Sequence, residues 1–371
     1  MRQIELGYQL VTQRTAAGAH PALLRNAMMD VLHAVRSSGS ISGAARELGY
    51  SYRHVWGQLK EWEAQLGQPL IVWERGQAAR LTPFGERLLA AERLAQARLG
   101  PQMENLRAEL ERAFSQVLDD GESTSEDDVL KLYASHDHAL GELMAFCAAR
   151  APSARLHLDI HFTGSVDAIR ALNEGRCGLA GFHSQPFAAA GSLAARTYRP
   201  LLKPGLHKII GFARRWQGLM VAPDNPLRLR DLRDVVRLQA RFVNRAKGTG
   251  TRLLLDELLA RDGLLAADID GYERVERSHA AVALAVANGD ADVGLGTGYA
   301  ARAAGLGFVP ITEERYLLVC LKTSLDLPAM QRLLAHLRSA DWAARLSGLA
   351  GYAPDHCGEV AAMKRLLPWW D

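Results

Sequence analysis

Hydrophobic residues recur with helical spacing through the first third of the chain, and residues 22–38 form the first such segment. Its apolar stripe consists of Leu24, Met28, Val31, Leu32 and Val35. This spacing predicts an amphipathic helix with one face in a core.

A second, shorter pattern follows at residues 40–62. Ser40 is a suitable N-cap for a short helix, Gly49 suits a tight turn with positive φ, and Ser51 suits the N-cap of a longer helix. The inward positions are Ala44, Ala45 and Leu48 on the short helix and Val55, Trp56, Leu59 and Trp62 on the longer one. Two helices joined by a glycine-containing turn predict a helix-turn-helix motif.

Residues 70–89 are predicted to form a strand, a turn, a second strand and the start of a helix. The first strand begins at Leu70, and Thr82-Pro83 is typical of a helix start because Pro suits the first helical position. We expect a wing at the turn and a linker or dimerisation helix over residues 83–118, broken or bent near Gly100-Pro101. The predicted winged helix-turn-helix domain covers residues 20–90, and the acidic segment 119–128 reads as a surface loop.

From Val129 onward, short β-branched or aromatic runs alternate with Ala- and Leu-rich helical segments. This alternation predicts an α/β domain over residues 129–345, followed by a C-terminal tail at residues 346–371. The tail is apolar enough to pack either on this domain or on a partner.

The helix-turn-helix predicts contacts with double-stranded DNA, since the N-terminal residues of the second helix reach base edges and a wing reaches phosphates. The alternative is a plain helical bundle with solvated arginines, because residues 20–90 hold eight Lys or Arg against six Asp or Glu. The candidate DNA-binding residues are Ser40, Ser42, Ser51, Tyr52, Arg53, His54, Gln58, Arg75 and Arg80.

The stretch Met29–Leu89, with Gly-Ser-Ile-Ser-Gly-Ala-Ala-Arg-Glu-Leu-Gly-Tyr-Ser-Tyr-Arg-His-Val-Trp from Gly39, closely resembles the DNA-binding domain of molybdate-responsive (ModE-type) regulators. It is more distantly similar to LysR-type regulators. The resemblance implies a homodimer, or a higher homo-oligomer, on a two-fold symmetric operator. The sequence departs from the molybdate regulators at residues 74–80, where the wing is shorter than usual.

In the α/β region several strands end in small polar or glycine-rich turns that begin helices. Helix N-termini with Ser, Thr and Arg side chains favour anions, and such turns meet at the carboxyl ends of parallel strands. The candidate ligand-binding residues are Ser135, His136, Thr163, Gly164, Ser165, Arg245, Gly248, Thr249, Gly250, Thr251, Arg252, Ser278, His279, Thr297 and Tyr299. The alternatives are purely structural: the Gly-Thr-Gly-Thr turn from Gly248 could be only a tight strand-helix connection, and Arg245 and Arg252 could form surface ion pairs.

The run Asn-Arg-Ala-Lys-Gly-Thr-Gly-Thr-Arg from Asn244 and the run Asn-Gly-Asp-Ala-Asp-Val-Gly from Asn288 resemble the type 2 periplasmic-binding-protein fold. The resemblance implies two lobes around a ligand, with strands near 208–212 and 316–321 crossing between them. Transport proteins of this fold that bind molybdate or tungstate carry a similar Gly-Ser/Thr-Gly-Thr turn. It therefore implies an oxyanion or a molybdenum-cofactor-related effector, although the loop from Ser135 lacks their run of Thr and Ser.

Composition narrows the function classes. The four cysteines form no C-x-x-C pair, which argues against a zinc cluster or disulfide framework. No segment approaches a membrane span, and no apolar h-region opens the chain, so we expect a cytoplasmic protein. The sequence around His136-Asp137-His138 is either a weak metal motif or a capped helix start, and we favour the cap.

These patterns together predict a one-component transcriptional regulator: a helix-turn-helix domain, a linker helix and a two-lobed sensor of a small anion. We expect no metal and no cofactor, and no enzymatic activity, because no nucleophile–base pair or nucleotide loop is visible. The alternatives are a regulator that senses a small organic anion such as a carboxylate, or an enzyme acting on a molybdopterin-like substrate.

Overall fold

The computed structural model describes residues 26–73, 78–118, 129–150, 154 and 156–370, in two compact units that meet at Ala90 and Ala91. The beginning of the helix predicted at 22–38, Arg75 of the wing and the acidic segment 119–128 lie outside these ranges.

The smaller unit is helical with a short β-hairpin. Its elements are α1 (Ala27–Ser38), α2 (Ile41–Leu48), α3 (Tyr52–Leu66), β1 (Ile71–Val72), β2 (Arg80–Leu81) and the start of α4 (Pro83–Leu118). Its core gathers apolar side chains from all three short helices, the hairpin and α4, among them Leu32, Ala44, Leu59, Leu70 and Leu89. The predicted helix-turn-helix and antiparallel wing strands are therefore confirmed.

The caps of α2 and α3 are those expected from the sequence. Ser40 accepts a hydrogen bond from the Gly43 N–H at 2.9 Å, and Ser51 accepts one from the His54 N–H at 3.2 Å. Between the helices Gly49 has φ 73°, the left-handed conformation in which glycine avoids a Cβ clash. The two caps and the left-handed glycine therefore favour a turn at the predicted position.

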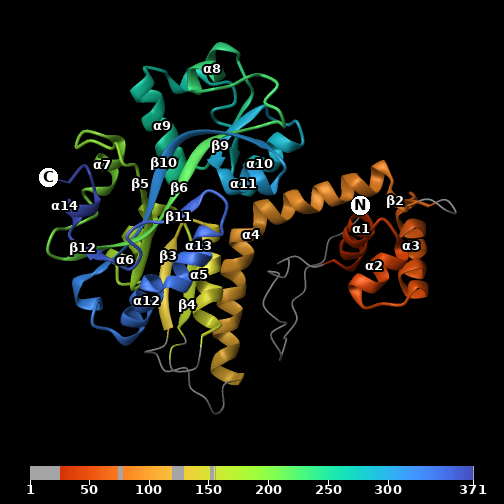
Figure 1. Ribbon diagram of the computed structural model, residues 1–371, viewed down its shortest axis with the longest axis horizontal. Helices are drawn as coiled ribbons and strands as arrows, with labels where there is room; N and C mark the ends of the chain where they lie inside the picture. The colour runs from red at the N-terminus through yellow and green to blue at the C-terminus, as the bar shows by residue number, and fades with distance from the viewer. Residues whose placement is uncertain (1–25, 74–77, 119–128, 151–153, 155, 371) are drawn as a thin grey trace. The chain divides into compact units, whose positions relative to one another are not determined.

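Helix α4 starts at Pro83 as expected, and Thr82 accepts a hydrogen bond from the Gly85 N–H. The helix is continuous from Pro83 to Leu118 and bends sharply partway along its length (Figure 1), so of the two predicted possibilities, broken or bent, the structure has the bend.

The larger unit is built on one mixed sheet with the strand order β4-β3-β5-β10-β6-β9-β7-β8. The strands are β3 (Val129–Ala134), β4 (His157–Phe162), β5 (Leu179–Ser184), β6 (His207–Val221), β7 (Phe242–Arg245), β8 (Val275–Glu276), β9 (Val293–Thr297) and β10 (Gly307–Leu321). Strands β3, β4 and β5 are parallel to one another, as are β7, β8 and β9. Strands β6 and β10 pair with each other over their whole length and link these two parallel sets (Figure 1).

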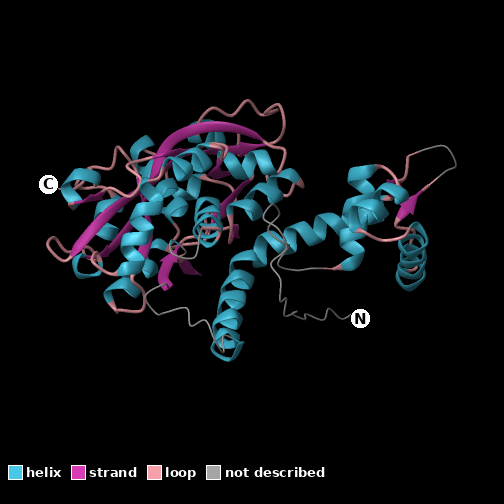
Figure 2. Ribbon diagram, turned by 60° about the horizontal axis from the view of Figure 1, so that its bottom comes forward, coloured by secondary structure: helices cyan, strands magenta, loops and turns pink. Residues whose placement is uncertain are grey.

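Two lobes follow from this topology. The first lobe contains β3–β5, α5 (His138–Ala148), α6 (Ser165–Asn173), α7 (Leu193–Tyr198), α12 (Pro328–Arg338), α13 (Ala340–Ser347) and α14 (Met363–Leu366). The second contains β7–β9, α8 (Leu232–Arg237), α9 (Gly250–Asp262), α10 (His279–Ala287) and α11 (Gly298–Ala303). Helices cover both faces of the sheet (Figure 2). The two long strands were predicted as short crossovers, and they are in fact 15 residues each.

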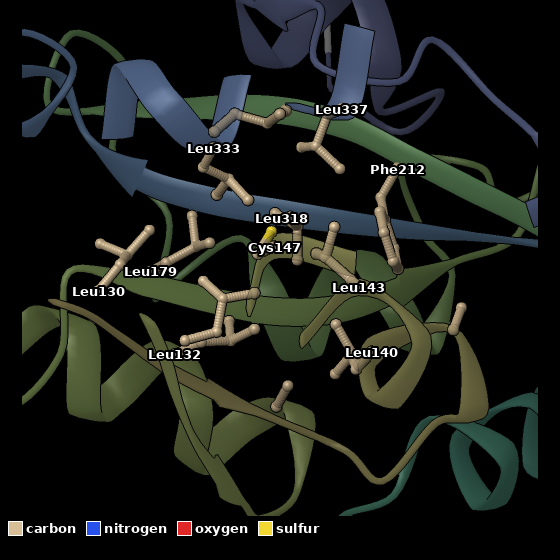
Figure 3. Close-up of a cluster of buried hydrophobic side chains, with 14 of the residues drawn as sticks. Leu130, Leu132, Leu140, Leu143, Cys147, Leu179, Phe212, Leu318, Leu333 and Leu337 are labelled. Atoms are coloured by element: carbon tan, nitrogen blue, oxygen red, sulfur yellow. The ribbon is translucent and has the colours of Figure 1, made fainter. Parts of the chain in front are cut away.

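The hydrophobic cores hold the helices against the sheet. In the first lobe Leu140, Leu143 and Cys147 of α5 and Leu333 and Leu337 of α12 face the strands (Figure 3). Separate apolar clusters fill the opposite face of this lobe and both faces of the second lobe.

The C-terminal segment packs on the first lobe. Strands β11 (Tyr352–Pro354) and β12 (Val360–Ala361) pair with β6, and Trp369 is fully buried in the apolar cluster behind β5. Of the two placements that the sequence left open, the structure therefore has the intramolecular one. Among the described residues, no helix combines the length and apolar character needed to cross a membrane.

We predict opposite effects from alanine at two glycines of the helix-turn-helix. Gly49→Ala should lower the stability of the smaller unit by about 1–2 kcal/mol, because the left-handed backbone crowds a Cβ. The matched variant Gly57→Ala, inside α3 with open space around the added Cβ, should raise it by about 0.5–1 kcal/mol. Hydrogen exchange of backbone amides 27–89 measures both. Equal effects of the two variants would contradict the assigned turn geometry.

Candidate functional site

The carboxyl ends of the parallel strands from both lobes meet at one junction. Helices α6, α9 and α10 begin there, each after a glycine, threonine or serine cap. The lobes touch directly at this place: a Cβ on Gly164 would lie 2.8 Å from the Gly248 carbonyl oxygen, and a Cβ on Gly250 would lie 2.9 Å from the His183 ring. The junction is therefore narrow and lined by helix N-termini from both lobes.

Hydroxyl and imidazole groups connect these helix starts. The Ser165 hydroxyl lies 3.1 Å from the Ser135 hydroxyl and 3.4 Å from His183 Nδ1. In the second lobe, Thr251 Oγ1 lies 3.4 Å from His279 Nε2. All five of these side chains are buried, so the junction has a polar interior.

Arg215 of β6 is the centre of a buried ion cluster. It pairs with Asp137, donates two hydrogen bonds to Glu314 at 2.9 and 3.0 Å, and donates one to His183 Nε2 at 2.9 Å. Glu314 stands directly opposite Arg215 in the β6–β10 ladder, and Asp137 caps α5 through the Ala139 N–H. Because arginine only donates, His183 accepts at Nε2 and carries its proton on Nδ1.

Arg245, at the end of β7, is the second buried arginine, and its guanidinium is not fully paired. The residue is 4% exposed, and neither its Nε nor its Nη1 has a hydrogen-bond partner among the described residues. Burial, reinforced by the neighbouring Arg215, lowers the pKa of Arg245 to about 10, which leaves it cationic at neutral pH. A buried cation without a partner is costly, so this guanidinium is suited to receive an anion.

The three histidines of the junction are neutral. Burial lowers the pKa of His136 to about 4 and holds the pKa values of His183 and His279 well below the ordinary value, with the nearby arginines acting in the same direction. The fixed positive charge of the site is therefore carried by arginine.

The structure brings only part of the predicted ligand set together at this junction. Ser135, Ser165, Arg245, Thr251 and His279 lie at it, with Gly164, Gly248 and Gly250 at the contact between the lobes. Thr249, Ser278 and Thr297 cap the helices that follow them. Thr163 continues from β4 by donating its N–H to the Ala134 carbonyl.

Three other predicted ligand residues have structural partners. The Arg252 guanidinium lies 3.9 Å over the Tyr272 ring and 3.5 Å from both Asp256 and Glu273. Tyr299 packs on His138 with ring centroids 4.1 Å apart, and His136 lies 3.6 Å from Glu104 of α4. Each of the three side chains thus has a partner within the protein, and Arg252 Nε still has no hydrogen-bond partner among the described residues.

Sequence reasoning missed Arg215, Gln217, His183, Asp137 and Glu314 as parts of the site. A signal was present, because the strand Arg214-Arg215-Trp216-Gln217 and the strand Glu313-Glu314-Arg315 carry complementary charges inside hydrophobic runs. Without the β6–β10 register, however, the sequence does not say which charges face each other.

The cap interpretation of His136-Asp137-His138 agrees with the structure. Asp137 uses its carboxylate on the Ala139 N–H and on Arg215, and α5 begins at His138. No group of three metal-type ligands occurs in the part of the chain that the structure describes.

Helix α4 binds both lobes next to the junction. On the second lobe Arg98 forms a two-pronged ion pair with Glu276, and the Ala97 carbonyl accepts a hydrogen bond from Ser278 at 2.6 Å. On the first lobe the Asn105 amide exchanges two hydrogen bonds with the Phe162 backbone, at 2.7 and 3.1 Å. Ser278 belongs to a predicted ligand turn, Phe162 directly precedes Thr163 of another, and Glu276 lies two residues before Ser278.

In the smaller unit, the start of α3 presents an exposed polar surface. Ser51, Tyr52, Arg53 and His54 are exposed on it, Gln58 is half-buried, and Arg80 is exposed on the second wing strand. On α2, Ser42 is exposed while Ser40 serves as the cap. Aromatic packing among Tyr52, Trp56 and Trp73 extends this surface and was not predicted.

Two family models match the chain. Residues 147–338, more than half of the 371, match the PBP superfamily domain. Residues 27–86 match the bacterial regulatory helix-turn-helix protein of the lysR family.

Three relatives are similar over parts of the chain. Bacillus subtilis YvgK is 33% identical over 199 residues, which cover 54% of this chain and 64% of YvgK. A Clostridium pasteurianum protein encoded in the 5′ region of the ferredoxin 2Fe-2S gene is 35% identical over 109 residues, 29% of this chain and 96% of that protein. The molybdenum-pterin-binding protein MopB of Rhodobacter capsulatus is 40% identical over 65 residues, 16% of this chain and 24% of MopB.

Solved structures match most of the chain at low sequence identity. One is a probable transcriptional regulator, PA0477, from Pseudomonas aeruginosa. It has 19% identity and a TM-score of 0.41, and the match covers 86% of this chain and 98% of that one. Full-length BenM matches with 15% identity and a TM-score of 0.44 over 88% of this chain and 98% of that one.

We predict that acid destabilises the larger unit through its buried histidines. Their pKa values are lowered in the folded state, so below pH 6.5 the unfolded chain binds more protons than the folded chain. The free energy of unfolding therefore decreases as the pH is lowered. Each histidine should contribute up to about 1.4 kcal/mol per pH unit between pH 6.5 and pH 5. Urea unfolding at pH 7.5, 6.5 and 5.5 measures this slope. A free energy of unfolding that stays constant over this range would contradict neutral buried histidines.

Proposed function

This chain belongs to the PBP superfamily and carries a LysR-family helix-turn-helix domain, and on that premise we propose that it is a DNA-binding transcriptional regulator controlled by a small anionic effector. The helix-turn-helix model describes regulatory proteins, which favours a regulator over an enzyme. The observation that carries the effector part is the buried guanidinium of Arg245 with two unpaired donors.

For the DNA-binding half, the support comes from α3 and the wing. The exposed start of α3 places Arg53 and its neighbours where a recognition helix reaches base edges in the major groove. Arg80 on β2 lies beside the wing, from which it would contact phosphate. We propose a homodimer on a two-fold symmetric operator, in keeping with the LysR-type resemblance.

For the sensor half, we propose an effector bound at the junction of the two lobes. Its anionic group would pair with Arg245, and the N–H groups at the starts of α6 and α9 add neutral donors. A molybdate- or tungstate-like oxyanion or a molybdenum-cofactor-related compound is one class of candidate, and the similarity to the molybdenum-pterin-binding protein MopB favours it. A small organic anion such as a carboxylate is the other.

We propose that α4 transmits the effector signal. It is held by Glu276 and Ser278 on one lobe and by Phe162 on the other, so a change in the distance between the lobes must strain or shift these bonds. An effector acts through this route only if it binds the two arrangements with different affinity.

Arg53→Ala should weaken operator binding by about 1–3 kcal/mol, since it removes a side chain offered to a base edge or a phosphate. Fluorescence anisotropy on an operator selected from random DNA measures the affinity, and a salt titration separates the two kinds of contact. The control is Arg36→Ala, an arginine in a surface ion pair with Glu86, which should bind normally. Equal loss in both variants would contradict α3 as the recognition helix.

Arg245→Ala should abolish the thermal stabilisation of the full chain by its anionic effector, because the removed guanidinium is the unpaired cation of the junction. A ligand at 100 times its Kd stabilises the wild type by about 2.7 kcal/mol, which a thermal-shift screen of molybdate, tungstate, sulfate and organic acids detects. The control is Arg241→Ala, an exposed arginine paired with Asp292, which should keep the response. A response that persists in Arg245→Ala would place the effector elsewhere.

A further inference from the structure

The junction contains unpaired acceptors as well as unpaired donors. Glu314 and Gln217 are fully buried, and neither Glu314 Oε1 nor Gln217 Oε1 has a hydrogen-bond partner among the described residues. These two atoms belong to the same network as Arg215, since Gln217 Nε2 donates to Glu314 Oε2 at 2.8 Å.

The orientation of the Gln217 amide is determined by its neighbours. Its Nε2 lies 2.8 Å from the Glu314 carboxylate and 3.2 Å from the Thr251 hydroxyl. Of the two ends of the amide, only the NH₂ group can donate a hydrogen bond to a carboxylate. The carbonyl oxygen of the amide must therefore face away from Glu314. The unpaired atom of Gln217 is an acceptor and not a misassigned donor.

The charge balance of the buried cluster also favours a ligand that carries a donor as well as an anionic group. The buried cluster holds two guanidinium groups, Arg215 and Arg245, against two carboxylates, Asp137 and Glu314. Both carboxylates pair with Arg215, whereas Arg245 lies near Glu314 without an ion pair between them within the described residues. A bare anion on Arg245 would make this buried cluster negative, while a ligand with an anion and a positive donor would leave it neutral.

Unpaired buried acceptors also distinguish between ligand classes. Molybdate, tungstate and sulfate at neutral pH only accept hydrogen bonds, so they match Arg245 and leave Glu314 Oε1 and Gln217 Oε1 without donors. A ligand with its own N–H group satisfies both sets of atoms.

We propose that the effector is a small organic molecule that combines an anionic group for Arg245 with an N–H donor for Glu314 and Gln217, and that bare oxyanions are not the effector. This inference rests on the proposed anion sensor and specifies its ligand class. An α-amino acid and a pterin that carries an acidic group both fit this description.

The test is a matched ligand series on the full wild-type chain. Calorimetry and thermal shift compare 2-oxo, 2-hydroxy and 2-amino acids of the same carbon skeletons, 6-carboxypterin, molybdate, tungstate and sulfate. We expect donor-bearing members to bind about 10- to 100-fold more tightly than the matched 2-oxo acids, because the oxo analogue leaves buried acceptors unpaired. Molybdate and tungstate should not exceed sulfate.

Two outcomes would overturn the inference in different ways. If an oxyanion or a 2-oxo acid binds at least as tightly as the donor-bearing ligands and Arg245→Ala abolishes that binding, the donor requirement is wrong and the anion sensor stands. If no member of the series binds, the proposed anion sensor itself is wrong.

A pair of variants at adjacent positions adds a second measurement. Glu314→Gln keeps the shape of the side chain and removes its charge, so it should reduce the preference for 2-amino over 2-hydroxy acids by about tenfold. Glu313→Gln is the control, because Glu313 pairs with the exposed Arg214 away from the cluster. The wild-type series decides the inference alone if Glu314→Gln does not fold.

Discussion

The buried ion cluster around Arg215 is the interaction on which the arrangement of the larger unit depends. Arg215 lies on β6, one of the two strands that run through both lobes, and it holds the start of α5, the end of β5 and the facing strand β10. Removing one member of such a cluster leaves uncompensated buried charge, which is far more costly than losing an exposed ion pair. The hinge strands, and with them the ends of the parallel strands, are therefore fixed relative to each other by electrostatics as well as by the β ladder.

This cluster also gives the junction its chemical character. Because Arg215 is matched by two carboxylates and the histidines are neutral, Arg245 remains the cation without a full set of partners. Glycines at positions 164, 248 and 250 let the two lobes approach closely at the junction, where helices from both lobes begin. The junction therefore holds buried donors and acceptors that have no partner among the described residues, which is the observation behind the proposed effector site.

The sequence predicted the features that depend on local chemistry. The caps at Ser40 and Ser51 and the turn at Gly49 were found because each involves neighbouring residues. The α/β character of the larger unit followed from the alternation of strands and helices, whereas its two lobes were implied by the resemblance to the type 2 periplasmic-binding-protein fold. The site was predicted only in part. Its arginine–carboxylate cluster depends on the β6–β10 register, a long-range pairing that no local pattern specifies. The contact between Arg252 and the Tyr272 ring is likewise one that the sequence did not indicate. The placement of Trp369 against the first lobe likewise depends on where a sheet presents an apolar face.

The contact between the two lobes at Gly164 and Gly248 has a kinetic consequence. In the proposed site an effector beside Arg245 would leave when the lobes separate, because the contact at Gly164 and Gly248 is made by backbone and has no side chain that could move aside. Its residence time would then depend on the rate at which the lobes open, which bonds from the ligand to both lobes would slow. A regulator of the proposed kind would respond to the history of effector concentration, since the occupied state would outlast a brief fall in supply.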